Sequence, residues 1–122
     1  MNRKEDFMFF TYPSEWKQIE SPHGYGAMHM IWGERVFAAI ITIPAHEPVQ
    51  EPHIHPNEQI GILLEGEVTM GVGGETRKLR KGDAYLAPSN IPHGRALVSP
   101  TEVKMLEIFS PPREDLIKRL KK

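Results

Sequence analysis

Three of the six histidines and one glutamine have types and spacings that could place several donor atoms together. His53 and His55 are two residues apart, Gln59 follows at i+4 from His55, and His93 comes after the turn at Pro88. In an extended chain, residues 53, 55 and 59 point to one face because side chains repeat every two residues. Their nitrogen and amide oxygen atoms could therefore converge on one point.

Two prolines support an extended backbone around the histidine pair. Pro52 and Pro56 favour an extended conformation at the residues before them and oppose a helix there. An isolated His-x-His pair is nevertheless more often an ordinary surface pair, and His93 could belong to an unrelated turn. The spacing alone leaves both interpretations open.

A carboxylate in the last apolar segment also needs an explanation. Glu107 shares a strand face with Met105 and Phe109. Near a metal ion it could act as a base or orient a substrate hydroxyl, and the alternative is an ordinary salt bridge. Tyr85, on the same face as Ala87, could be a core residue or a pocket hydroxyl.

Composition restricts the chemistry and the partners. The chain has no cysteine, which excludes disulfides and thiolate metal sites and leaves histidine, carboxylate and amide as possible ligands. A net charge of -1 argues against nucleic acid as a partner. No apolar run approaches the roughly 20 residues of a membrane span, and the first residues lack a signal-peptide pattern. We therefore expect a cytoplasmic protein with no membrane partner.

The elements that must position these residues are predicted to be short strands. Ten glycines and eleven prolines recur along the 122 residues, which is typical of strands joined by turns. Gly73-Gly74 indicates a two-residue hairpin turn. The predicted strands are Ala27 to Trp32, Arg35 to Ile43, Glu58 to Leu64, Glu67 to Val72, Thr76 to Leu79, Asp83 to Ala87 and Val103 to Phe109.

The pattern predicts one all-β domain over residues 1–122, a small sandwich or barrel of the jelly-roll type with a short C-terminal helix. Residues 1–26 are expected to form an N-terminal arm. Residues 110–122 are expected to form the helix, with Ser110 as its cap, Pro111 in the first turn and a Glu114–Lys118 pair.

The histidine pattern resembles the two sequence motifs of the cupin superfamily. His53-Ile-His55, Gln59 and Gly66 follow the first motif, and Gly82-Asp83, Pro88 and Pro92-His93 follow the second. This resemblance implies a double-stranded β-helix barrel. It also implies one divalent transition metal, Ni, Fe, Mn, Co or Zn, held by His53, His55, Gln59 and His93.

The end of the chain is similar to the KdgF family of pectin-degradation cupins. The family pattern Asp-x-Phe-Ser-Pro-x-Arg is matched by Glu107, Phe109 and Arg113, with glutamate in place of aspartate. The resemblance implies that these three residues face a sugar acid and that 4,5-unsaturated uronates are converted to linear keto forms. Arg113 could clamp a carboxylate, and the alternative is a solvated residue in a first helical turn.

Three functions remain open from the sequence. The first is a metal-dependent, isomerase-type enzyme for a small anionic substrate such as a uronate. The second is a small cupin dioxygenase, because three histidines can leave open positions on iron. The third is a metabolite-binding cupin without catalysis.

The strand after Gln59 has a second apolar face that needs a cover. Ile60, Ile62 and Leu64 point away from the candidate ligands, whereas Gly61 and Leu63 share the ligand face. An uncovered apolar strip is an interaction surface. We expect either a homodimer or coverage by the aromatic N-terminal segment, which contains Phe7, Phe9, Phe10 and Trp16.

Overall fold

The computed structural model describes residues 8–21 and 26–121, so Phe7 and His23 lie outside the described residues. The fold is all-β, as predicted. In these residues the elements are β1 (Lys17–Glu20), β2 (Ala27–Trp32), β3 (Phe37–Ile43), β4 (Glu58–Glu65), β5 (Val68–Val72), β6 (Glu75–Leu79), β7 (Ala84–Ala87), β8 (His93–Arg95), β9 (Val103–Ser110), α1 (Glu114–Ile117) and the 3-10 helix η2 (Lys118–Lys121).

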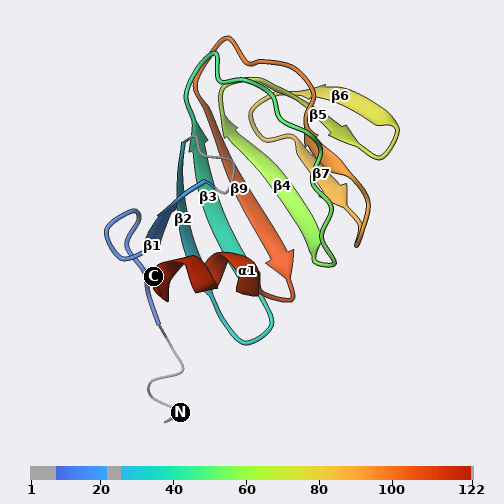
Figure 1. Cartoon of the computed structure of the whole chain (residues 1–122). Helices are drawn as coiled ribbons and strands as arrows, with labels where there is room; N and C mark the ends of the chain where they lie inside the picture. Colours follow the sequence, from blue (N-terminus) through green and yellow to red (C-terminus); the bar gives the residue numbers. More distant parts are fainter. Residues whose placement is uncertain (1–7, 22–25, 122) are drawn as a thin grey trace.

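The strands form two antiparallel sheets with the jelly-roll arrangement (Figure 1). The larger sheet has the order β1-β2-β3-β9-β4-β7, and the smaller has the order β6-β5-β8. Strand β9, close to the end of the chain, therefore lies between β3 and β4 in the middle of the large sheet. This crossover places Glu107 directly beside the strand that carries Gln59.

Alternating apolar residues build one core between the two sheets. Strand β3 alternates strictly, with Phe37, Ala39, Ile41 and Ile43 buried. The buried residues of β5, Val68 and Met70, contribute from the small sheet to the same cluster. Their burial removes apolar surface from water, which is the main favourable term in folding. The core thereby holds the two sheets together around the space that contains the histidines.

The predicted Gly73-Gly74 hairpin is confirmed. Strand β5 ends at Val72 and β6 begins at Glu75, and Gly73 has a φ of +60°. This left-handed conformation suits glycine, which has no Cβ to clash with the backbone.

Two strands were not predicted from the sequence. Strand β1 pairs with β2 at the edge of the large sheet, inside the segment that we expected to be an arm. Its sequence Lys-Gln-Ile-Glu is mostly polar and exposed, so it lacks the alternation that marks a half-buried strand. Strand β8 has only three residues and includes a glycine, which weakens any strand signal.

The C-terminal helix begins later than the sequence pattern predicted. Ser110 does not cap it, because Ser110 still pairs with Glu58 in the sheet and its hydroxyl donates to the carbonyl of Arg35. The N-cap position is Arg113, after two prolines. Leu116 and Ile117 are buried and anchor the helix in the core, and it lies across one end of the large sheet (Figure 1).

The outer face of the large sheet, which points away from the small sheet, carries a row of apolar side chains. Five neighbouring strands contribute one outward residue each to this apolar row: Ile31, Ala38, Ile108, Ile60 and Leu86. Ile60 and Leu86 are 41% and 51% exposed.

The described part of the N-terminal segment, residues 8–21, contacts one part of this face. Tyr12 makes a ring contact with His29, and Lys104 lies near the Tyr12 ring, so the segment reaches one part of the sheet. Phe9 is 93% exposed. Coverage of the apolar strip by Phe9 is therefore not observed. Within residues 8–21 and 26–121, no helix combines the length and apolarity that a membrane crossing requires.

Candidate active site

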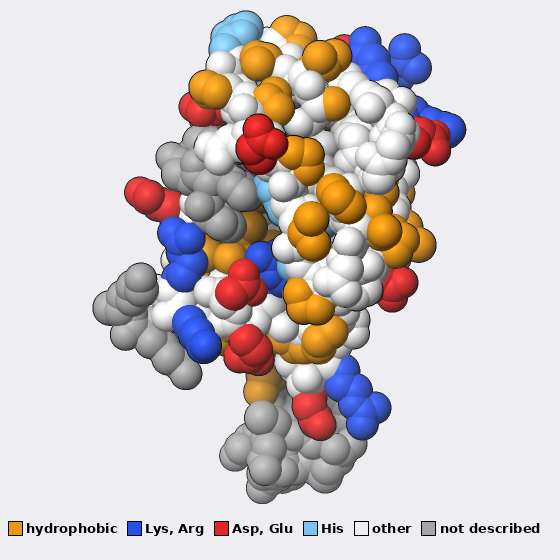
Figure 2. All heavy atoms as spheres, turned by 45° about the vertical axis from the view of Figure 1, so that its right-hand side comes forward, with side chains coloured by type: hydrophobic (Ala, Val, Ile, Leu, Met, Phe, Trp, Pro, Cys, Tyr) orange, Lys and Arg blue, Asp and Glu red, His pale blue; other side chains and the backbone are white. Residues whose placement is uncertain are grey.

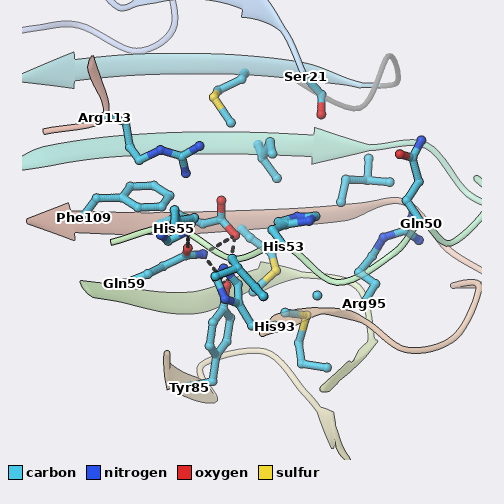
Figure 3. A pocket seen from close by; sticks show the side chains of 18 of the residues that line it. Ser21, Gln50, His53, His55, Gln59, Tyr85, His93, Arg95, Phe109 and Arg113 are labelled. Atoms are coloured by element: carbon cyan, nitrogen blue, oxygen red, sulfur yellow. Dashed lines mark hydrogen bonds between the residues drawn. The ribbon is translucent and has the colours of Figure 1, made fainter. Parts of the chain in front are cut away.

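A pocket of about 180 Å³ opens between the two sheets, and all seven candidate site residues line it. Figure 2 shows histidine atoms in a hollow near the middle of one face, close to a basic side chain. In the close-up, Arg113 and Phe109 lie at one end, Ser21, Gln50 and Arg95 at the other, and the histidines between them (Figure 3). A concave pocket with a few polar groups pointing into it suits a small-molecule ligand.

Backbone pairing brings the two histidine motifs together. His53 N–H donates to the carbonyl of His93 at 2.8 Å, and His93 N–H donates to the carbonyl of His53 at 3.0 Å. The rings of His53 and His93 are 5.5 Å apart between centroids, and those of His55 and His93 are 4.7 Å apart. Residues separated by forty positions in the chain thus become neighbours, an arrangement that the resemblance to the two cupin motifs implies and the spacing alone leaves open.

Two histidines present nitrogen lone pairs to the pocket. The Nδ1 of His93 lies 2.9 Å from the carbonyl of Ile91, and that of His55 lies 3.0 Å from the carbonyl of Asn57. A carbonyl only accepts, so each Nδ1 carries the proton and each Nε2 carries the lone pair. His93 Nε2 is buried and has no hydrogen-bond partner among the described residues. A buried nitrogen lone pair without a hydrogen-bond partner is suited to binding a cation.

Gln59 adds an oxygen to this pair of nitrogens. Its Nε2 donates to the Tyr85 hydroxyl at 2.7 Å and to Oε2 of Glu107 at 3.2 Å. Its Oε1 therefore faces His55 Nε2, at 3.0 Å. Two acceptors that face each other repel unless a proton or cation lies between them, so this arrangement also fits a bound cation.

The histidines alone do not make a complete centre. In the part of the chain that the structure describes, no three His, Cys, Asp or Glu side chains are grouped so that they could hold a metal ion. The two candidate metal-binding atoms that do meet are His55 Nε2 and Gln59 Oε1. The Nε2 of His93, which has no hydrogen-bond partner among the described residues, belongs to the neighbouring ring. His53 lies beside His93 through its backbone pairing and its ring.

Burial shifts the titration of the pocket groups. Burial lowers the pKa of His55 and of His93, and the positive charge of Arg113 lowers both further. Both imidazoles are therefore neutral at pH 7, as metal ligands must be. Burial raises the pKa of Glu107, although the Tyr85 hydrogen bond and Arg113 oppose this. A raised carboxyl pKa suits proton transfer near neutral pH.

Arg113 is held between an aromatic ring and a carboxylate. Its Nε and Nη2 donate to the two oxygens of Asp115 at 2.9 and 2.8 Å, and its guanidinium lies 4.9 Å from the Phe109 ring centre. The Arg113 side chain is only 12% exposed. The alternative of a solvated first-turn residue is therefore wrong.

The pocket also contains residues that the sequence analysis did not assign to it. Tyr85, for which the sequence allows either a core or a pocket position, lines the pocket and also packs against the core. Asp115, Arg95, Gln50 and Ser21 also line the pocket. These residues come from loops, a short strand and a helix start, where no side-chain periodicity indicates direction.

Its two-sheet jelly roll and histidine-lined pocket place this protein among the small β-barrel proteins. Comparison with known proteins identifies the family. A family model described as a cupin domain matches residues 39–109, more than half of the sequence. The chain belongs to the cupin family.

Three relatives are informative. An H2HPP isomerase of Bacillus subtilis is 34% identical over 109 residues, which cover 88% of this chain and 45% of that protein. The pectin degradation protein KdgF of Dickeya dadantii (strain 3937) is 36% identical over 67 residues, covering 54% of this chain and 60% of that protein. The solved structure of KdgF from Halomonas sp. has a TM-score of 0.73 and 25% identity, with 90% of this chain and 99% of that chain covered.

The likeness to KdgF proteins supports the resemblance inferred from the sequence. The chain spans less than two thirds of the length of the curated relatives. One of these relatives is named as an isomerase and another as a pectin degradation protein. These names support the interpretation that this chain is an enzyme. Their own activities apply to those proteins.

Proposed function

We propose that this cupin is a metal-dependent isomerase that opens the ring of a 4,5-unsaturated uronate and yields its linear keto form. The observation that carries the proposal is the environment of Glu107. Its carboxyl group lies in a pocket within hydrogen-bond reach of Gln59 and Tyr85, and burial raises its pKa. A desolvated carboxyl group beside an arginine suits proton transfer on an anionic substrate. The similarity to KdgF proteins supports the substrate class.

His53, His55, Gln59 and His93 would hold the metal ion. Their nitrogen and oxygen donors suit Ni, Fe, Mn, Co or Zn. All four ligands are neutral, so none of them would offset the 2+ charge. When bound, the ion would act as a Lewis acid on a substrate oxygen.

The remaining residues bind the substrate and move its protons. Arg113 would bind the uronate carboxylate through the part of its guanidinium that Asp115 does not occupy, and Phe109 would support that guanidinium from below. Glu107, as carboxylate, would take the proton of the hemiacetal hydroxyl. The ring carbon–oxygen bond then breaks toward the ring oxygen, and the resulting enolate takes a proton at carbon from Glu107. The proton taken from the hydroxyl is returned to carbon, so the reaction is an isomerisation and needs no oxidant.

The test is an assay of purified protein with a measured metal content. We expect catalysed loss of the enol-ether absorbance without oxygen uptake, and loss of that activity by at least about 100-fold in Glu107→Gln, which keeps the shape but not the proton transfer. Glu102→Gln, an exposed loop residue, is the matched control.

Two other outcomes of this assay would contradict the proposal, and each would favour a different function. Oxygen consumption with the same substrate would indicate a dioxygenase. Uronate binding without turnover in the wild type, unchanged in Glu107→Gln, would indicate a binding module.

We propose further that a second copy of this chain covers the outer face, giving a homodimer. The row of apolar residues across five strands could pack against the same row of a second copy, which is the arrangement of a two-fold interface. Exposed Ile60 and Leu86 would lie in the contact.

A further inference from the structure

Three polar side chains from three neighbouring strands form a closed triangle in the pocket. Gln59 of β4 donates to the Tyr85 hydroxyl of β7 at 2.7 Å and to Glu107 Oε2 of β9 at 3.2 Å. The Tyr85 hydroxyl in turn donates to the same Oε2 at 3.1 Å. The dashed lines in Figure 3 mark these bonds. Tyr85 has no role in the mechanism above, although it touches two residues that do.

The triangle exists because the strand between Tyr85 and Glu107 carries a glycine. Gly61 of β4 is the register partner of Tyr85 on one side and of Glu107 on the other. A Cβ at Gly61 would lie 2.1 Å from Tyr85 Cε2 and 2.7 Å from its hydroxyl oxygen. Any larger residue would therefore displace the ring, so the hydroxyl could not reach across β4 to Glu107.

The bonds of the triangle fix two other atoms. Both N–H groups of the Gln59 amide are used, which directs its Oε1 toward His55 Nε2. Both donors to Glu107 end on Oε2, and no hydrogen bond to its Oε1 is present among the described residues. Oε1 is thus the carboxyl oxygen left for a substrate proton.

We propose that Tyr85 is a positioning residue that orients the Gln59 amide toward the metal and holds Glu107 by Oε2, with Gly61 providing the space for its ring. This deepens the proposed function, because it assigns the proton transfer to Oε1 of Glu107. A partner of a metal ligand typically contributes about 10- to 100-fold to metal affinity. Misplacement of a reacting group by about 1 Å costs on the order of 100-fold in rate.

The test compares Tyr85→Phe with wild type in two assays, and Tyr12→Phe serves as the matched control outside the pocket. We expect Tyr85→Phe to bind Co²⁺ about 10-fold more weakly when the ion is titrated into metal-free protein. In the uronate assay we expect kcat to fall about 10- to 100-fold with KM changed less than about threefold. Tyr12→Phe should match wild type in both assays.

Gly61→Ala tests the space independently. It keeps every polar group but displaces the ring, so a folded variant should show the same weakened Co²⁺ binding as Tyr85→Phe. If Gly61→Ala does not fold, as judged by its thermal unfolding, Tyr85→Phe decides the question alone.

The proposal is overturned if Tyr85→Phe binds Co²⁺ as tightly as wild type, or if the variant raises KM at constant kcat. If the wild type shows no turnover of the uronate, the proposed function fails while the Co²⁺ titration still decides the role of Tyr85. The two failures are therefore distinguishable.

Discussion

At the scale of single residues, Arg113 is the side chain whose chemistry is most restricted. Asp115 binds two of its nitrogens and Phe109 lies under its guanidinium, so the planar fork has a fixed direction in the pocket. Lysine offers a single point charge and cannot reproduce this geometry. The pair of contacts therefore predicts what a conservative substitution will do.

We predict that Arg113→Lys raises KM for the uronate about 10-fold and lowers kcat less, because the bidentate contact to the carboxylate is lost. Steady-state kinetics measure both constants. Arg119→Lys, an exposed residue of η2, is the control and should leave them unchanged. An unaltered KM in Arg113→Lys would mean that the substrate carboxylate is bound elsewhere.

The pKa values of His55 and His93 predict a pH dependence of the metal-free protein. Burial lowers both pKa values below 6.5 in the folded state. As the pH falls below about 6.5, the unfolded chain takes up protons that the folded chain resists, so the free energy of unfolding decreases. We predict that the melting temperature of chelator-treated protein falls by several degrees between pH 7.5 and 5.5.

A double variant isolates this effect. Glu107, whose pKa is raised, acts in the opposite direction at lower pH, because its folded form binds a proton more readily than the unfolded form. It is present in wild type and in His55→Gln/His93→Gln alike, so the difference between their melting curves reports the histidines. His46→Asn, at an exposed position with positive φ, should keep the wild-type slope. An equal slope in the double variant would exclude the two histidines as its cause.

At the scale of elements, Asn57 joins the histidine loop to the segment before the C-terminal helix. Its buried side chain donates to the carbonyls of Pro111 and Pro112, and its own carbonyl lies against His55 Nδ1. Arg113 follows these prolines directly. One amide therefore ties the candidate ligands to the candidate substrate clamp.

We predict that Asn57→Ala destabilises the fold by about 1–3 kcal/mol, because two carbonyls lose their donor. We also expect kcat/KM to fall, because the position of Arg113 relative to His55 is no longer fixed by the Asn57 side chain. Chemical denaturation and steady-state kinetics test the two parts. Gln18→Ala, an exposed amide on β1, should change neither quantity. Normal stability in Asn57→Ala would show that the two segments are held by other contacts.

The elements that sequence analysis predicted well are those with strong alternation or specific turns. Strand β2 was predicted with its observed bounds, and the Gly73-Gly74 turn was located. Strand β1 was missed because a polar edge strand depends on its neighbour for hydrogen bonds, which no local pattern records. The helix start was misplaced because Ser110 remains paired in β9, and this pairing with Glu58 is a long-range contact.

The candidate site was predictable where parity and motif spacing apply. The positions of Gln59 and Glu107 on the inner face follow from alternation along β4 and β9. The triangle with Tyr85 was not predictable, because it requires the strand order β7-β4-β9, which places three segments from distant parts of the chain side by side. The contact of Asp115 with Arg113 likewise depends on where the helix begins.

At the scale of the whole molecule, the two faces of the large sheet have different tasks. The inner face carries the core and the pocket, and the outer face carries an apolar row that ends at Ile60 and Leu86. On this outer face Ile60 and Leu86 are 41% and 51% exposed, at the side of the large sheet where β4 and β7 lie (Figure 1). A second copy would bury it without obstructing the pocket, because the two lie on opposite sides of β4.

We predict that Leu86→Glu shifts the protein from dimer to monomer in analytical ultracentrifugation, because a charge placed in an apolar contact is desolvated without a partner. Leu97→Glu places the same charge at another exposed leucine, in the loop after β8, and should leave the dimer intact. Since Leu86 lies on the outer face and the candidate ligand Gln59 on the inner face, monomeric Leu86→Glu should keep its affinity for Co²⁺. A wild-type protein that sediments as a monomer at micromolar concentration would contradict the assignment of this face to a second copy. Loss of Co²⁺ binding in a folded monomer would instead show that dimer formation supports the pocket through β4.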